Sequence, residues 1–105
     1  MERVPDVKGG KMGITEVQIK SKHLIKAYDE VLGFLSVHKY EMKQAIKPAK
    51  IICKRPRHFG RDSNIKIGFW NRPDEGIAAV AIEWNRKAKS DALVIADTLL
   101  SKYAK

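Results

Sequence analysis

The residues of this chain whose types could carry out chemistry lie at one end of a predicted β-hairpin. Two alternating stretches, 64–70 and 77–85, flank the turn-forming sequence NRPDEG, which predicts an antiparallel pair of strands. With Trp70 opposite Ile77, the large apolar residues of both strands share one face, which we expect to be the core face. The other face then gathers carboxylates, amides and a lysine at one end, namely Asp62, Asn64, Lys66, Glu83 and Asn85.

Polar groups of these types are suited to holding a divalent cation beside a phosphate. Mg²⁺ prefers oxygen ligands and keeps several waters, so Asp62 and Glu83 are the candidate metal ligands. Such an ion can orient a scissile phosphate and activate water, with Lys66 or Lys87 stabilising the charge that develops. The candidate catalytic residues are Asp62, Glu83, Asn85 and Lys87. The structural alternative pairs Asp62 with a nearby arginine and Glu83 with Lys66 across the strands.

The predicted elements include a helix, three antiparallel strands and a second helix. An acid lies at the start of the second of these strands, and a Glu-x-polar sequence lies at the end of the third. This arrangement resembles the PD-(D/E)XK nuclease core. The run AVAIEWNRK is similar to the EWN-type third strand of some restriction endonucleases. The resemblance covers residues 22–104 in topology and implies a Mg²⁺-dependent nuclease. Asp62 would match the metal-binding aspartate and Glu83 the glutamate, while Asn85 stands where the family usually has lysine. Aligning the Trp-Asn pair instead puts Ala81 at the first acid, which implies an inactive relative.

The positive charge of the chain is concentrated in residues 43–72. The 105 residues include 21 Lys+Arg and 12 Asp+Glu, for a net charge of +9. The window holds nine cations and one acid, Asp62, and so carries eight of the nine net charges. Solubility alone does not require charge of one sign, so this excess favours a polyanionic partner, DNA or RNA.

The connection RPRHFGRDS carries arginines, whose planar forks fit phosphate, and two rings, His58 and Phe59, that could stack on a base. We expect Trp84 to pack in the core, whereas packing and base stacking are both open for Trp70. The candidate nucleic-acid-binding residues are Lys39, Lys43, Lys47, Lys54, Arg55, Arg57, His58, Arg61 and Lys66.

The sequence pattern predicts the elements that would position these groups. They form an α/β (α+β) fold in the order (β)αβββα. Residues 14–19 alternate as in an edge strand, and residues 22–47 have helical periodicity that ends at Pro48. On that helix Lys39, Lys43 and Lys47 would line one edge. Strands are predicted over 49–54, 64–70 and 77–85, which gives a small, mainly antiparallel sheet of three to four strands flanked by two helices.

The final helix is predicted to begin with Ser90 as its N-cap. Its apolar stripe would consist of Leu93, Ala96, Leu100 and Tyr103. We expect an irregular arm over residues 1–13 and a single domain over 14–105. Cys53, the only cysteine, is expected to be a buried small residue in a reducing compartment.

Several classes of function lack their sequence signals. Motifs for nucleoside triphosphates, dinucleotides and serine hydrolases are absent, and the three histidines are not spaced as zinc ligands. The sequence also lacks an apolar stretch long enough for a membrane and a secretory signal at its start, which by elimination predicts a cytoplasmic protein. Exposed edges at 14–19 or 49–54 could support a homodimer.

Three functions remain open from the sequence. The first is a minimal Mg²⁺-dependent nuclease that uses Asp62 and Glu83. The second is a non-catalytic nucleic-acid binder, such as a ribonucleoprotein accessory factor. The third is an interaction module for an acidic protein partner.

Overall fold

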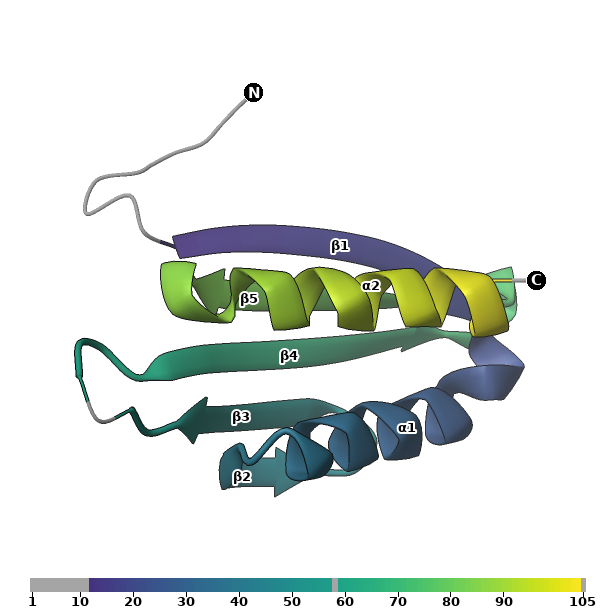
Figure 1. Cartoon of the computed structure of the whole chain (residues 1–105). Helices are drawn as coiled ribbons and strands as arrows, with labels where there is room; N and C mark the ends of the chain where they lie inside the picture. Colours follow the sequence, from purple (N-terminus) through teal and green to yellow (C-terminus); the bar gives the residue numbers. More distant parts are fainter. Residues whose placement is uncertain (1–11, 58, 105) are drawn as a thin grey trace.

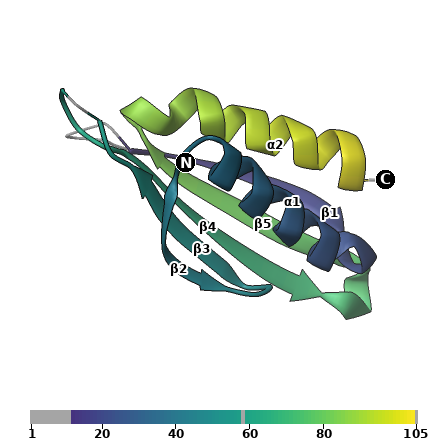
Figure 2. The same ribbon diagram turned by 60° about the horizontal axis from the view of Figure 1, so that its bottom comes forward.

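Alternating apolar and polar residues build an antiparallel sheet, and two helices cover one of its faces (Figures 1 and 2). The computed structural model describes residues 12–57 and 59–104. Its helices and strands are β1 (Met12–Lys20), α1 (Leu24–Val37), β2 (Glu41–Ile46), β3 (Lys50–Arg55), β4 (Ser63–Arg72), β5 (Ile77–Asn85) and α2 (Lys89–Tyr103). The predicted α+β class is confirmed, but the described residues form five strands, in the spatial order β1-β5-β4-β3-β2.

The β4–β5 hairpin has the predicted core face but a different register. Trp70 pairs with Ala79 rather than Ile77, so the predicted register was wrong by two residues. The reason is a tighter turn: a 3₁₀ turn at Pro73–Glu75 is followed by Gly76, whose positive φ of 73° completes the reversal. A shift of two residues keeps every side chain on its face. The core face is therefore confirmed, with Ile65, Ile67, Phe69, Val80 and Ile82 buried.

The helix predicted over residues 22–47 is wrong in its second half. α1 ends at Val37, where the His38 ring stacks on the Phe34 ring with centroids 4.0 Å apart. The Phe34 carbonyl oxygen accepts from the His38 backbone N–H at 3.0 Å and also lies 2.9 Å from Nδ1 of the same histidine. Lys39 then adopts a positive φ of 70° and turns the chain towards β2.

A β-bulge explains why residues 41–46 were mistaken for helix. The pairing of β2 with β3 shifts between Met42 and Gln44, so Met42 packs against the core while Ile46 is exposed. Their spacing of four residues therefore does not mark one helical face. The three lysines expected along a helix edge lie instead in a turn, in β2 and in the following turn: Lys39, Lys43 and Lys47.

The buried stripe of α2 differs from the predicted stripe, mostly by one residue position. Its buried residues are Ala92, Ile95, Ala96 and Leu99, whereas Leu93 and Leu100 are exposed. The small side chains of the two alanines let the helix approach the sheet closely, so the neighbouring leucines turn outward. Ser90 does not cap the helix, which follows a short 3₁₀ turn (Arg86–Ala88) capped by the Asn85 side chain.

The second face of the sheet is the open face, because the part of the chain that the structure describes places both helices on the other side (Figure 2). β1 is an edge strand as predicted, but β3 lies inside the sheet and β2 forms the other edge. Cys53 of β3 is buried as expected, and burial raises the pKa of its thiol to about 12.

Two further sequence expectations were an irregular N-terminal arm and the lack of a membrane-spanning segment. Residues 1–11 of the predicted arm lie outside the described residues, while Met12 and Gly13 already belong to β1. Neither of the described helices has the length and apolar character needed to cross a membrane.

Candidate nucleic-acid interface

The pairing of the strands places basic side chains in neighbouring rows of the open face. Lys66 of β4 lies between Glu83 of β5 and Ile52 of β3, because it pairs with both. Two residues along the sheet, Lys50 of β3 pairs with Gly68 of β4. Directly opposite residues share a face, as do residues two apart on one strand. Lys66 and Lys50 therefore project from the same surface.

Two adjoining hollows follow this face. The larger, of about 540 Å³, has Lys50, Trp70, Lys66 and Glu83 in its lining. The smaller, of about 150 Å³, shares Lys66 and Glu83. Together the two hollows form what we call the open-face trough. Its lysines are Lys43, Lys50, Lys54 and Lys66.

Trp70 presents a large aromatic surface in this trough. The residue is 56% exposed, although tryptophan usually buries most of its area. Its six-membered ring lies over Gly68: a Cβ added to that glycine would come within 2.9 Å of the ring. The glycine therefore makes room for the ring to lie back along β4 towards the middle of the trough. Trp84, by contrast, is partly buried against the core as predicted, and its Nε1 donates to Thr15 Oγ1 at 3.4 Å.

Three of the four trough lysines are available to a ligand. Over residues 12–57 and 59–104, no carboxylate oxygen lies within 4.0 Å of the ammonium group of Lys43, Lys50 or Lys66. Lys54 is the exception, with its Nζ 3.5 Å from Asp62 Oδ2. An ammonium group without a carboxylate partner can contact phosphate without first breaking an ion pair.

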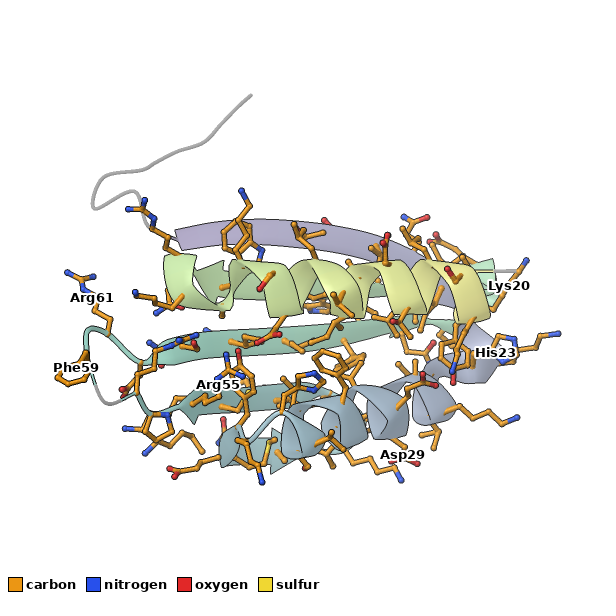
Figure 3. All side chains as sticks on the ribbon, in the orientation of Figure 1. Lys20, His23, Asp29, Arg55, Phe59 and Arg61 are labelled. Carbon is orange, nitrogen blue, oxygen red and sulfur yellow. The ribbon has the colours of Figure 1, made fainter. Side chains whose placement is uncertain are left out.

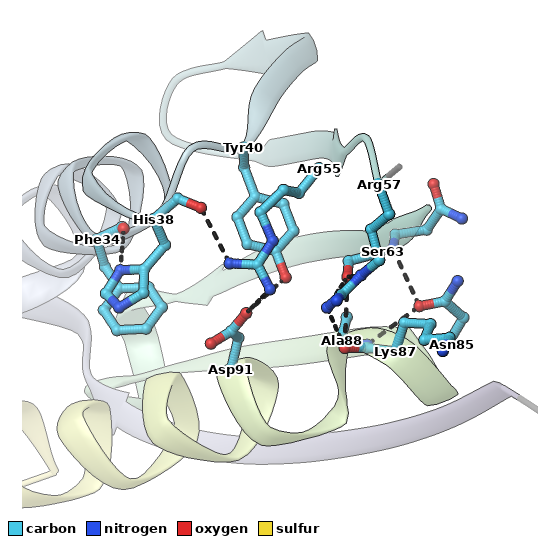
Figure 4. Close-up of polar contacts among 11 residues, drawn as sticks. Phe34, His38, Tyr40, Arg55, Arg57, Ser63, Asn85, Lys87, Ala88 and Asp91 are labelled. Carbon is cyan, nitrogen blue, oxygen red and sulfur yellow. Dashed lines mark hydrogen bonds and ion pairs between the residues drawn. The ribbon is translucent and has the colours of Figure 1, made fainter. Parts of the chain in front are cut away.

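Arg55, by contrast, holds the end of β3 against the helices (Figure 4). Its guanidinium lies 3.4 Å from Asp91 and donates to the His38 carbonyl oxygen at 3.2 Å. It also lies 5.1 Å from the centre of the Tyr40 ring. The Tyr40 hydroxyl donates to the same aspartate at 2.7 Å, and burial together with this bond raises the pKa of Tyr40 well above its ordinary value. These contacts give Arg55 a structural role on the helix side.

Two further predicted binding residues are also engaged within the fold. Arg57 Nε and Nη2 donate to Ser63 Oγ at 3.0 and 2.9 Å, which fastens the loop after β3 to the start of β4 (Figure 4). Lys47 lies 2.9 Å from Asp29 of α1. Nucleic-acid contact by Lys47, Arg55 and Arg57 stays a prediction, and in each case it competes with an existing contact.

The loop between β3 and β4 extends beyond one end of the sheet. Figure 3 shows Phe59 and Arg61 at its tip, at the opposite end of the molecule from Lys20 and His23. Phe59 is 89% exposed, and Arg61 is also exposed. His58 lies outside the described residues. The loop thus offers a second basic and aromatic surface next to the trough.

The two acids of the predicted metal site lie in different surroundings. Glu83 stands opposite Lys66 in the trough, whereas Asp62 is four residues before Lys66, or about 13 Å of extended chain. The Asp62 carboxylate faces Lys54 and accepts a bond from the Arg57 backbone N–H at 3.4 Å. Within the described residues, no three His, Cys, Asp or Glu side chains gather in one place. The shared Mg²⁺ site at Asp62 and Glu83 was expected from a register that the strands do not have, and it stays a prediction.

Asn85, a predicted catalytic residue, is buried and serves the backbone (Figure 4). Its Oδ1 accepts from the backbone N–H groups of Asn64 at 3.0 Å and Ala88 at 3.2 Å, and its Nδ2 donates to the Asp62 carbonyl oxygen at 2.7 Å. Lys87 lies in the 3₁₀ turn after β5, where its backbone carbonyl accepts from Ser63 Oγ at 3.4 Å. Neither residue lines the open-face trough.

Comparison of the chain with protein-family models, curated proteins and solved structures found no match. The likeness to PD-(D/E)XK nucleases therefore stays a resemblance of sequence pattern, and the nuclease activity stays a prediction.

Sequence reasoning left Lys50 out of the binding residues and did not place Trp70 in a trough. The alternation in residues 49–54 contained the signal for Lys50, because Lys50, Ile52 and Lys54 must share a face if Ile51 and Cys53 face the core. The correct register of β4 and β5 would have brought Lys66 opposite Glu83. That register depends on the geometry of a turn, which composition alone does not fix.

Proposed function

We propose that this protein binds single-stranded nucleic acid in the open-face trough. In this proposal Trp70 stacks against an unpaired base, and the trough lysines contact phosphates on either side of it. Base stacking on an exposed aromatic residue of a sheet, with flanking cations, is a common way for proteins to bind single strands. The observation that carries the proposal is an exposed tryptophan held over Gly68 in a hollow whose two lysines have no carboxylate partner among the described residues.

A single strand fits this surface better than a duplex. Bases in a duplex are stacked on each other and do not offer a free face to Trp70. The larger hollow, of about 540 Å³, lies on one face of a sheet and not in a helix or ribbon shaped to enter a groove. The basic loop at the end of the sheet could extend the same path for the phosphates.

Charge reversal tests the trough directly. We expect the double variant Lys50→Glu/Lys66→Glu to bind a fluorescent oligonucleotide at least about tenfold more weakly than the wild type, because phosphate contacts dominate affinity. The matched control is Lys22→Glu/Lys26→Glu, which changes the net charge equally at exposed residues near the start of α1. Equal weakening by both variants would mean that only the overall charge matters, and it would overturn the proposed site.

The stacking role of Trp70 has its own test. Trp70→Ala should weaken binding roughly 5- to 150-fold, the cost of one lost base stack, and Trp70→Phe should restore most of it. Because Trp70 is 56% exposed, neither change is expected to unfold the protein, and circular dichroism checks this. Unchanged binding by Trp70→Ala would exclude stacking. Cleavage of the oligonucleotide with Mg²⁺ by the wild type but not by Glu83→Ala would favour the nuclease instead.

A further inference from the structure

We infer that Glu83 and Lys66 together recognise a guanine base of the bound strand; this inference rests on the proposed function. The two residues are direct cross-strand partners on β5 and β4, so their Cβ atoms are about 5 Å apart. Both line the larger and the smaller hollow, which places them where the two hollows meet.

Glu83 is an unusual residue for a surface that contacts phosphates. It is the one acid in the lining of either hollow among the described residues, where it stands with the four trough lysines. Its carboxylate is not within 4.0 Å of a cationic nitrogen in the part of the chain that the structure describes. A carboxylate there repels a polyanion, so it weakens binding unless it accepts hydrogen bonds from the ligand. The donors of a nucleic-acid strand are on its bases and, in RNA, on its 2′-hydroxyls.

The chemistry of the pair selects one base among the four. An ionised carboxylate offers two acceptors, and a lysine ammonium group offers donors only. Side by side they present a donor followed by two acceptors, which is the pattern on the pairing edge of cytosine. The complementary edge belongs to guanine, with its O6 acceptor next to the N1–H and N2–H₂ donors. Uracil, cytosine and adenine would instead place a carbonyl oxygen or a ring nitrogen lone pair against the carboxylate.

The position of Trp70 brings a base within reach of the pair. Its ring lies over Gly68, which pairs with Ala81, so Glu83 is the diagonal neighbour of Gly68 at about 7–8 Å. That distance suits a base which lies against the ring and directs its pairing edge along β5. Trp70 and Glu83 indeed line the same hollow.

The test uses fluorescent oligouridylates that differ at one central nucleotide: uridine, guanosine, inosine, adenosine or cytidine. We expect the wild type to bind the guanosine oligonucleotide at least about tenfold more tightly than the uridine one. Inosine, which lacks the N2 amino group, should fall between them. Glu83→Gln should remove the guanosine preference, whereas Glu16→Gln, which makes the same charge change on β1 outside the hollows, should keep it.

The outcomes separate this inference from the proposed function. Base recognition by Glu83 is overturned if the wild type binds every oligonucleotide with the same affinity. It is also overturned if Glu83→Gln binds every oligonucleotide more tightly by the same factor and keeps the preference of the wild type. Binding in the trough would still stand on the loss caused by Lys50→Glu/Lys66→Glu. If the wild type binds none of them, the proposed function fails and the guanine inference fails with it.

Discussion

At the residue scale, Asn85 shows how a polar side chain at the end of a strand can organise the backbone around it. Its amide accepts two hydrogen bonds and donates one, all with backbone groups of two segments, residues 62–64 and the 3₁₀ turn before α2. This one side chain therefore ties the end of β5 to the beginnings of β4 and α2. In the sequence the same residue, between Trp84 and Arg86 after a glutamate, resembled part of a catalytic motif.

Replacing Asn85 by alanine should cost stability. Two backbone N–H groups and one carbonyl would lose their partners in a largely buried position, at about 1–3 kcal/mol for each group left unsatisfied and partly compensated by water. We expect the free energy of unfolding to fall by about 2–4 kcal/mol, measured by urea denaturation. Asn64→Ala is the matched control, because the Asn64 side chain is exposed and makes only a 3.5 Å contact. A similar loss in both variants would contradict this role.

At the element scale, one acid links the middle of α1 to the C-terminal end of α2. Glu30 of α1 accepts from Lys102 Nζ at 2.7 Å and from the Tyr103 hydroxyl at 2.6 Å, both from α2. The bond from Lys102, and then the bond from Tyr103, hold the pKa of the Glu30 carboxyl below its ordinary value. Because the helices cover the core side by side, this link fixes their relative position.

The Glu30 link predicts a pH dependence of stability. A carboxyl whose pKa is lower in the folded state stabilises the protein above its unfolded pKa of about 4.3, and this stabilisation is lost as the pH falls through the lower folded value. Since Lys102 is more than half exposed, we expect Glu30→Gln to lower the free energy of unfolding by less than about 1 kcal/mol at neutral pH. The difference between wild type and variant should shrink towards about pH 3 in urea unfolding experiments. Asp97→Asn is the exposed-acid control, and a difference that grows in acid would contradict the assignment.

The elements also show how far the sequence alone could lead. β1, β4 and β5 were predicted because large apolar residues recur at every second position of their sequences, which is typical of a strand with one buried face. β2 was missed because its bulge produced a helix-like spacing of Met42 and Ile46. The candidate site depended on register and on a turn, so the correct residue types were found but were assigned the wrong neighbours. Trp70 became a site residue only once Gly68 was seen beneath its ring.

At the scale of the whole molecule, the acids of the helices pair with cations on their own side, whereas most trough lysines on the open face have no carboxylate partner among the described side chains. Asp29, Glu30 and Asp91, all on the helices, pair with Lys47, Lys102 and Arg55. Three of the four trough lysines lack such partners among the described side chains. Residues 43–72, which carry eight of the nine net positive charges, include these lysines and the adjoining loop, so this part of the molecule attracts a polyanion most strongly.

This asymmetry predicts how binding responds to salt. Each phosphate neutralised on a single strand contributes about −0.7 to the slope of log K against log salt concentration. The three trough lysines that have no carboxylate partner among the described residues therefore predict a slope of about −2. Lys50→Glu/Lys66→Glu should make the slope less steep by about 1.4, measured by anisotropy from about 50 to 200 mM salt. Lys22→Glu/Lys26→Glu should leave it unchanged, because those side chains lie away from the trough. A slope near zero in the wild type would mean that phosphates are not contacted, and that tight binding, if observed, comes from stacking on Trp70 alone.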